Sequence, residues 1–199
     1  KQFVFMSSAI VYGDSAPIGH KKIITNDTIP QPANFYGDSK LQAENGILPL
    51  SNETFKVVIL RPPMIYGKGC KGNYQMLVKF ALNLPVFPYV ENERSMLYIE
   101  NLCEFVRMLI EDEEQGIFWP QNSEYSNTSE MVKMIANAHG KKVILVRGFT
   151  WLLIIMSHCT GMINKAFGNM AYGTEISPHK ENYIMYSLPE SLERTEQNK

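Results

Sequence analysis

A tyrosine and a lysine four residues apart are the residues of this chain best suited to acid–base chemistry. In Tyr36-Gly37-Asp38-Ser39-Lys40, the two side chains stand at i and i+4, which is one turn apart on the same face of a helix. A phenol with a pKa of about 10 is a poor base at neutral pH, but a neighbouring ammonium group stabilises the phenolate. The pair therefore predicts a general base that removes a proton from an alcohol.

A serine ahead of this pair could supply a hydroxyl to the same reaction. Ser7 and Ser8 directly follow Phe3-Val4-Phe5-Met6, an apolar run typical of a buried strand. Sites in α/β sheets are built at the carboxyl ends of parallel strands. We therefore expect Ser8 to hydrogen-bond the substrate oxygen that Tyr36 deprotonates. An ordinary turn or capping serine is the alternative interpretation.

Segments typical of strands and helices alternate along the chain, which favours an α/β fold with a parallel sheet. A long irregular segment over residues 9–33 is rich in Pro, Gly, Asp and Asn. Such long connections in a compact domain are usually functional. The pattern predicts helices over 35–48, 74–83, 101–112 and 129–139, and strands over 2–6, 57–60, 86–87, 96–99 and 143–146.

The most apolar stretch of the chain runs from Phe149 to Met156. It is too short to span a bilayer, which takes roughly 20 residues, and Arg147 and His158 flank it closely. We expect a helix buried in the core. Contact with a membrane surface is the alternative.

The bulk composition is that of an ordinary globular domain. Hydrophobic residues make up 45% and charged residues 20% of the 199 residues, and the net charge is -1. This balance gives no electrostatic basis for binding nucleic acid or an anionic membrane, so neither is expected as a partner. The three cysteines show no C-x-x-C pair and no zinc spacing. We therefore expect no metal site, free thiols and a cytoplasmic location.

Residues 67–72, Gly-Lys-Gly-Cys-Lys-Gly, fit the pattern G-x-G-x-x-G. A dinucleotide fingerprint directly follows its strand, whereas here residues 61–66 separate the glycines from the strand predicted over 57–60. We therefore interpret this segment as a loop on the substrate side. Lys68 and Lys71 could help to hold a phosphate there.

Four motifs occur in a fixed order and together resemble one family. They are Ser7-Ser8-Ala9-Ile10-Val11-Tyr12-Gly13, the Tyr36/Lys40 pair, Leu60-Arg61-Pro62-Pro63-Met64-Ile65-Tyr66-Gly67, and Tyr98-Ile99-Glu100-Asn101-Leu102. The set resembles the extended short-chain dehydrogenases/reductases, in particular the NAD-dependent nucleotide-sugar epimerases and dehydratases. The resemblance covers residues 2–140 well. Further on, Tyr183 to Thr195 resembles the terminal strand and helix of that family.

The resemblance assigns roles to the first of these motifs. Tyr36 matches the catalytic base, Lys40 matches the lysine that binds the nicotinamide ribose, and Ser8 matches the serine that binds the reacting hydroxyl. Ser7 and Pro62 fall where the family approaches the nicotinamide end of the cofactor, which is NAD.

Two further residues are implied to contact the substrate. Arg94 matches an arginine that binds the substrate diphosphate, and a guanidinium fork suits phosphate oxygens. Met64 stands near the substrate phosphates, three places after Arg61, where the family often has asparagine. A thioether cannot donate a hydrogen bond, so this position does not carry over a particular sugar nucleotide.

The implied fold is the C-terminal portion of a Rossmann-type doubly wound parallel sheet plus a small α/β substrate-binding region. Residues 1–66 would be the remnant of the NAD-binding domain that carries the serine and Tyr-x-x-x-Lys. Residues 67–199 would form most of the substrate-binding region, with interleaved segments. The glycine fingerprint would lie in an N-terminal part that this sequence lacks, so we expect the chain alone to bind NAD poorly.

The implied function is an NAD-dependent 4-epimerase that acts on a nucleoside-diphosphate sugar, preferably a UDP-sugar, through a transient keto intermediate. A dehydratase needs an added acid–base pair near Tyr36, and Ala33-Asn34-Phe35 offers none. An NAD(P)-dependent dehydratase or reductase, and a truncated non-catalytic remnant that serves as a binding module, remain the alternatives. The full-length protein is expected to be capable of forming a homodimer.

Overall fold

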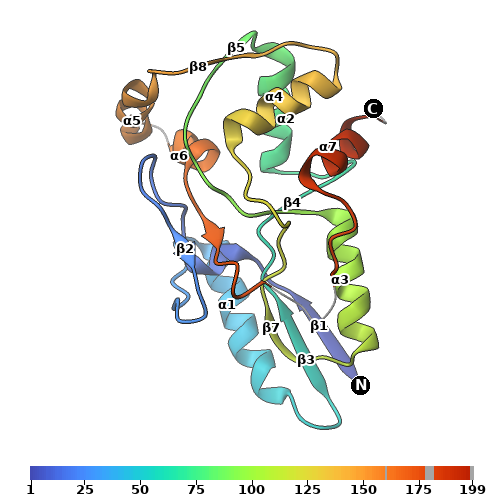
Figure 1. The fold of residues 1–199 in the computed structure, drawn as a ribbon. Coiled ribbons are helices and arrows are strands. Elements are labelled where there is room, and N and C mark those ends of the chain that lie inside the picture. Colours follow the sequence, from blue (N-terminus) through green and yellow to red (C-terminus); the bar gives the residue numbers. More distant parts are fainter. Residues whose placement is uncertain (160, 178–181, 198–199) are drawn as a thin grey trace.

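The structure is a computed structural model that describes residues 1–159, 161–177 and 182–197, without the side chains of 158–159 and 161–162. One end of the molecule holds a small parallel sheet between helices, and the other end is mainly helical (Figure 1). Both chain termini lie on the same side of the picture, the N-terminus at the sheet and the C-terminus at the helical end. Cys159 falls among the side chains that are not described.

The sheet consists of β1 (Gln2–Met6), β3 (Lys56–Leu60) and β7 (Gly116–Phe118), all parallel, in the order β1-β3-β7. Helices α1 (Phe35–Ile47) and α3 (Ile99–Glu111) lie on opposite sides of it (Figure 1). The central strand β3 is buried from Val57 to Leu60, as expected for a parallel strand covered on both faces. These observations confirm the predicted α/β class with a partial Rossmann-type sheet.

A short 3-10 helix, η1 (Ala9–Tyr12), follows β1 directly. Further along the same irregular segment, β2 (Ile23–Ile24) pairs in parallel with β9 (Ala171–Tyr172). This pairing joins the loop between β1 and α1 to the last third of the chain. The side chains of Ile24 and Tyr172 are buried in a small core together with η1.

The helical end contains the largest core. Its helices are α2 (Asn73–Asn83), α4 (Thr128–Ala138) and α7 (Leu188–Glu196). Two pairs of short parallel strands accompany them, β4 (Met64–Tyr66) with β6 (Met96–Tyr98) and β5 (Val86–Pro88) with β8 (Ile144–Val146). The fully buried side chains at its centre include Tyr66, Tyr74, Met131 and Ile135.

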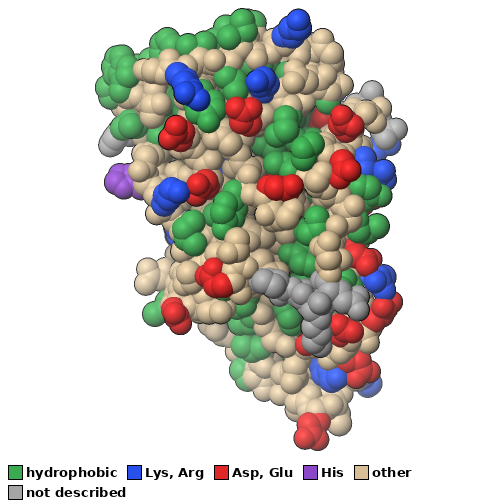
Figure 2. Space-filling model, viewed as in Figure 1, with side chains coloured by type: hydrophobic (Ala, Val, Ile, Leu, Met, Phe, Trp, Pro, Cys, Tyr) green, Lys and Arg blue, Asp and Glu red, His purple; other side chains and the backbone are tan. Residues whose placement is uncertain are grey.

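The apolar stretch from Phe149 to Met156 corrects one prediction. It forms α5 (Thr150–Cys159), which precedes α6 (Gly161–Phe167), but it is not a buried helix. Trp151 is 63% exposed and Ile155 is 57% exposed. Leu153 alone among the described side chains of this stretch packs against the large core, as a partly buried residue. Figure 2 shows green side chains at the edge of the molecule where Figure 1 places α5.

The other predicted helices are confirmed to within about two residues at each end, which is the usual uncertainty of helix boundaries. Of the terminal strand and helix that Tyr183 to Thr195 resembles, the helix is present as α7, whereas residues 183–186 join no ladder of the described sheets. Strands β4 and β7 were not expected, since prolines before β4 and a glycine at the start of β7 are typical of loops. No helix in the described part of the chain has the length and apolarity needed to cross a membrane.

Candidate active site

The Tyr36/Lys40 pair lies at the carboxyl end of β1. Asn34 caps α1 by accepting a hydrogen bond from the N–H of Gly37 at 3.0 Å, so the helix begins just before Tyr36. The Lys40 Nζ atom lies 5.8 Å from the centroid of the Tyr36 ring and donates a 2.9 Å hydrogen bond to the carbonyl of Met6. Tyr36 is 55% exposed. The structure therefore places the two side chains together and leaves the tyrosine open to a ligand.

Ser8 lies at the same end of β1 as the Tyr36/Lys40 pair, because α1 packs closely on η1. We call this place, with Ser8, Tyr36 and Lys40, the catalytic corner. A Cβ atom at Gly37 would lie 2.8 Å from the carbonyl oxygen of Ile10, so only glycine permits this approach. The Ser8 hydroxyl accepts a 3.3 Å hydrogen bond from the N–H of Ile10 and caps η1. A hydroxyl that accepts one hydrogen bond can still donate another. The capping role and the predicted substrate contact are therefore compatible.

A buried ion pair lies beneath this corner and was not expected from the sequence. The Arg61 guanidinium donates to Glu44 through Nη2 at 2.5 Å and through Nε at 3.2 Å, and to the Tyr12 hydroxyl at 2.6 Å. The side chains of Arg61 and Glu44 are 7% and 2% exposed. Burial alone would lower the pKa of Arg61, but the hydrogen bonds and charges of Glu44 and Tyr12 outweigh it and raise the pKa.

The helical periodicity could have pointed to this network. Tyr36, Lys40 and Glu44 are spaced at i, i+4 and i+8, so all three side chains lie on the face of α1 that meets β1 and η1. What the periodicity alone could not supply is the partner, because Arg61 is 17 residues further along the chain.

The structure limits what Ser7 and Pro62 can offer to a cofactor. The Ser7 side chain is buried and donates a hydrogen bond to Glu44, and its N–H donates to the carbonyl of Leu60 at 2.7 Å. The carbonyl of Pro62 accepts a 2.9 Å hydrogen bond from the N–H of Ala9. Both residues therefore fix the backbone around Ser8.

Arg94 directly precedes Ser95 and β6, and it has a different environment. Its Nη1 donates to the carbonyls of Lys165 at 2.6 Å and Ala166 at 2.9 Å, at the C-terminal end of α6. No carboxylate of the described residues forms an ion pair with it. Burial lowers the pKa of Arg94 to about 10. An arginine that lacks a carboxylate partner in this way would be stabilised by an anion that binds from outside the chain.

Arg94 and Met64 meet at one small cavity. The cavity has a volume of about 40 Å³ and is lined by Ala9, Pro63, Met64, Arg94, Ser95, Met170, Ala171 and Tyr172. Because Ala9 is the neighbour of Ser8, the predicted substrate residues adjoin the predicted catalytic corner. The site residues predicted from the sequence thus form one band, which runs from α1 across η1 to β4 and Arg94.

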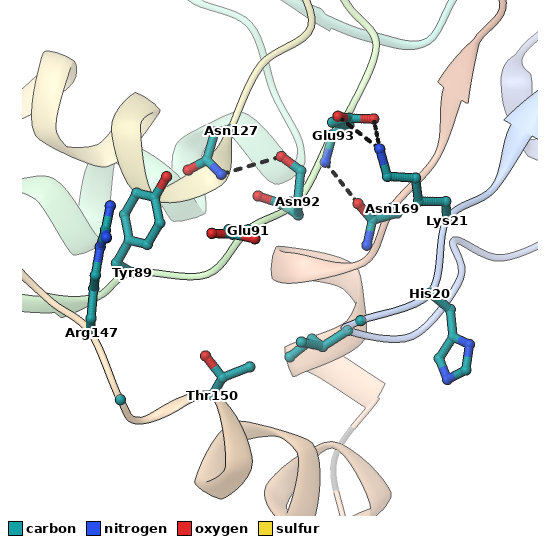
Figure 3. Close-up of a pocket in the computed structure, with 13 residues that line it drawn as sticks. His20, Lys21, Tyr89, Glu91, Asn92, Glu93, Asn127, Arg147, Thr150 and Asn169 are labelled. Carbon is teal, nitrogen blue, oxygen red and sulfur yellow. Dashed lines mark hydrogen bonds and ion pairs between the residues drawn. The ribbon is translucent and has the colours of Figure 1, made fainter.

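A larger cavity of about 610 Å³ lies beside this band and contains none of the predicted site residues (Figure 3). The ion pair between Lys21 and Glu93, 3.0 Å long, lies at one side of it, and Arg147 stacks 4.8 Å from the ring of Tyr89 at the other. The lining residues come from several distant segments of the chain, among them residues 18–21, 89–93 and 147–150. No local sequence pattern could have predicted this cavity.

The 67–72 glycine segment also needs a correction. Strand β4 ends at Tyr66, directly before Gly67, and α2 begins at Asn73 directly after it. The expectation that no strand directly precedes these glycines is therefore wrong. However, β4 pairs with β6 and not with the three-stranded sheet. The segment is a loop of the helical end, and its place on the substrate side stays a prediction.

Known proteins share both the sequence and the fold. The model of the NAD dependent epimerase/dehydratase family matches residues 1–119. UDP-glucose 4-epimerase of Vibrio cholerae is 29% identical over 174 residues, which cover 84% of this chain and 50% of that protein. N-acetyl-alpha-D-glucosaminyl-diphospho-ditrans,octacis-undecaprenol 4-epimerase of Escherichia coli O157:H7 is 26% identical over 176 residues, which cover 84% of this chain and 51% of that protein.

Among solved structures, UDP-glucuronic acid 4-epimerase from Bacillus cereus in complex with NAD superposes with a TM-score of 0.70 at 17% identity. The superposition covers 99% of this chain and 60% of that one. The chain therefore spans about half the length of the two sequence relatives, and about three fifths of the solved structure.

Proposed function

Because this chain belongs to the NAD-dependent epimerase/dehydratase family, we propose that it carries the catalytic and substrate-binding residues of an NAD-dependent 4-epimerase acting on a nucleoside-diphosphate sugar. The observation that carries the proposal is the Tyr36/Lys40 pair at the carboxyl end of β1, with Lys40 Nζ 5.8 Å from the Tyr36 ring. Beyond Ser8 and Ala9, the small cavity that Ala9 lines holds Arg94, an arginine without a carboxylate partner in the described part of the chain.

In the proposed reaction, Tyr36 takes the proton from the 4-hydroxyl of the sugar and Ser8 holds the same oxygen by a hydrogen bond. Lys40 places an ammonium group 5.8 Å from the centre of the Tyr36 ring. NAD, when bound, supplies the chemistry of accepting and returning the hydride at C4. Tyr36 then returns its proton to the oxygen of the 4-keto sugar after the sugar has turned over, so the reaction ends with no net oxidation.

The residues present fit the nicotinamide end of such a cofactor. Tyr36 is exposed and Lys40 reaches the last carbonyl of β1, while the hydrogen bonds of Ser7 and Pro62 fix the backbone on either side of Ser8. We assign residues 1–66 to the NAD-binding domain and residues 67–199 mostly to the substrate-binding region. The interleaving is visible in β7, which comes from the second range and completes the sheet of the first.

For the substrate, we propose a UDP-sugar whose diphosphate lies against Arg94 and beside Met64. The guanidinium of Arg94 uses Nη1 for the carbonyls of α6, so its other N–H groups can face phosphate oxygens. A homodimer formed in part through α1 belongs to the same proposal.

A sugar attached to a lipid diphosphate, of the kind named for the Escherichia coli relative, is a second candidate substrate. The exposed apolar side chains of α5 favour it, because a lipid-linked substrate resides in a membrane. Arg94 would bind the diphosphate in either substrate. Parallel assays with a UDP-sugar and with the lipid-linked sugar distinguish the two candidates.

A dehydratase is disfavoured by the surroundings of Ser8. The next two residues are Ala9 and Ile10, and neither they nor Ala33 to Phe35 provide an acid or base close to Tyr36. A reductase on the same scaffold is separated by product analysis. Interconversion of two sugars without net change of NADH indicates the epimerase, whereas stoichiometric consumption of NADH indicates the reductase.

The test uses the intact protein that carries these residues and the change Tyr36→Phe. Loss of the phenolic hydroxyl should lower kcat by about 10²–10⁴-fold with little change in KM, since a general base contributes on this scale. Tyr186→Phe, a matched change on the loop before α7, should leave kcat unaltered. Full activity of Tyr36→Phe would assign the base elsewhere, and a native protein that binds UDP-sugar but never turns it over would favour a non-catalytic binding module.

A further inference from the structure

One end of the molecule exposes an unusual amount of apolar surface. Along α5 and the residue before it, Phe149, Trp151, Leu152, Ile154, Ile155 and Met156 are each between 38% and 63% exposed. Exposed residues lie around most of the helix, so α5 is not the amphipathic helix that normally covers a core. Burying one face of α5 against this protein therefore still leaves an apolar face in water.

The neighbouring strand pair extends this surface. Val86 of β5 and Ile144 of β8 are register partners, and they are 49% and 64% exposed. Partners in register point to the same face of a sheet. In Figure 2, green side chains continue along the upper edge, where Figure 1 places α5, β8 and β5. We call the set of Val86, Ile144, Phe149, Trp151, Leu152, Ile155 and Met156 the apolar end.

The chain segment between Glu130 and Glu175, which forms most of the apolar end, carries basic residues and no acidic ones, although Glu91 and Glu93 line the cavity beside Arg147 and Thr150. Between Glu130 and Glu175, the sequence contains no aspartate or glutamate, so all 20 acidic residues lie outside this stretch. The same stretch contains five basic residues, Lys133, Lys141, Lys142, Arg147 and Lys165, and all five are exposed. In a protein with a net charge of -1, the segment that supplies most of the apolar end is therefore basic.

We propose that the apolar end docks on an anionic membrane surface, with α5 lying in the plane of the interface. Tryptophan is enriched at the interface between membrane and water, and the basic residues that accompany α5 lie in the neighbouring segments of the chain. Helix α5 has 10 residues and is about 15 Å long, which suits a helix lying on the surface and not across it.

The charges favour a membrane over a second copy of this chain. A symmetric dimer through the apolar end would bring the basic segments 131–174 of two copies together, and like charges across an interface oppose association. An anionic lipid surface instead attracts each basic residue by about 1 kcal/mol near the membrane. Arg147 and Thr150 also line the 610 Å³ cavity, so the docked surface would lie next to that cavity.

The experiment measures binding of the intact protein to vesicles by co-sedimentation and by the fluorescence of Trp151. Vesicles of phosphatidylcholine with an equal share of phosphatidylglycerol should bind the protein at least about tenfold more tightly than vesicles of phosphatidylcholine alone. Replacing Trp151 and Ile155 together by serine should weaken binding by about tenfold or more. Both side chains are exposed, so the fold should be retained.

Two controls make the result specific. Ile29→Ser removes an apolar side chain that is 75% exposed but lies outside the apolar end, and it should leave vesicle binding unchanged. Trp151→Phe keeps the apolar surface and should still bind, but it should lose the shift of tryptophan emission to shorter wavelength. The remaining tryptophan, Trp119, is partly buried and hydrogen-bonded to Tyr12.

The proposal is overturned if the native protein does not sediment with anionic vesicles, or if Ile29→Ser weakens binding as much as the double serine variant. It is also overturned if the native protein forms a dimer that the double variant abolishes while vesicle binding is absent, since the apolar end would then contact a second copy. The assay needs no turnover, so its outcome is independent of the proposed epimerase activity.

Discussion

Two arginines, the buried Arg61 beneath η1 and the partly buried Arg94 just before β6, are held by the protein in different ways. Arg61 is bound by the carboxylate of Glu44 and by the Tyr12 hydroxyl. Arg94 donates to two carbonyls and pairs with no carboxylate of the described residues. Accordingly the pKa of Arg61 is raised, whereas burial lowers the pKa of Arg94 to about 10.

The difference separates a structural cation from a cation available to a ligand. The charge of Arg61 is balanced within the protein, and its hydrogen bonds fix the backbone that carries Ser8 and α1. The charge of Arg94 is not balanced by a carboxylate of the described residues, so an external anion would stabilise it. The comparison can be tested by removing each charge or its partner, and the expected losses of unfolding free energy run from large to small.

The largest effect is expected from Glu44→Gln. The change keeps the volume of the side chain but leaves the buried guanidinium of Arg61 without its counter-charge. Breaking a buried ion pair in this way typically costs about 3–5 kcal/mol. Denaturant unfolding of the variant should show a loss of unfolding free energy of that order. A loss below about 1 kcal/mol would mean that the Arg61–Glu44 pair is not buried from water in solution.

A double change should recover much of this loss. Replacing Arg61 by methionine and Glu44 by leucine removes both charges and fills the space with apolar groups of similar volume, which is often neutral or stabilising at buried ion pairs. We expect the free energy of unfolding to come within about 2 kcal/mol of the native value. A double variant as unstable as Glu44→Gln would show that the hydrogen bonds to Ser7 and Tyr12, and not the charge, stabilise this region.

The buried hydroxyl of Tyr66, which is uncharged in the folded protein, should make stability depend on pH in the alkaline range. Its hydroxyl accepts a hydrogen bond from Asn122 at 2.9 Å and contacts Ser191 at 2.5 Å. Burial is the main cause that raises the pKa of Tyr66 to about 12. Between pH 10 and 12 the unfolded chain therefore loses this proton while the folded chain keeps it, so stability falls as the pH rises.

For one such group, the expected loss at pH 11 relative to pH 8 is about 1.4 kcal/mol. Other buried tyrosines titrate as well, so the measurement is the difference between the native protein and Tyr66→Phe. The variant lacks the ionisable hydroxyl and should lose less stability over this range. Equal losses in the two proteins would contradict the raised pKa.

The sequence predicted those features whose physical cause is local. The spacing of Tyr36 and Lys40 is enough to place them on one helix face, and the apolar run from Val57 to Leu60 is enough to indicate a buried strand. The order of the four motifs along the chain was enough to indicate the family. Features that depend on partners far apart in the chain were missed, such as the Arg61–Glu44 pair and the cavity shared by Lys21, Tyr89 and Arg147.

Helix α5 shows a different reason for failure. An apolar run is usually buried because the hydrophobic effect favours it, so the sequence from Phe149 to Met156 predicted a core helix. Whether such a helix is covered depends on the elements that surround it, and in this fold the described residues cover only part of it. The absence of acidic residues from 131 to 174 was visible in the sequence, but the overall net charge of -1 concealed it.

The smallest effect on stability, and the sharpest test of the comparison, is expected from Arg94→Met. The change removes a cation that caps the C-terminal carbonyls of α6, which contributes about 1 kcal/mol or less, and it also removes the cost of keeping a charge out of water. The free energy of unfolding should therefore change by less than about 1 kcal/mol. The affinity of the intact protein for UDP, measured by calorimetry, should instead fall by about 10–100-fold, the value of a charge-assisted hydrogen bond to phosphate.

Arg107→Met is the matched control, since Arg107 pairs with Glu104 and Glu111 on the exposed side of α3 and should affect neither the unfolding free energy nor the UDP affinity by much. If Arg94→Met destabilises the fold as strongly as Glu44→Gln and leaves UDP binding intact, the two arginines have the same structural role and the proposed diphosphate site lies elsewhere.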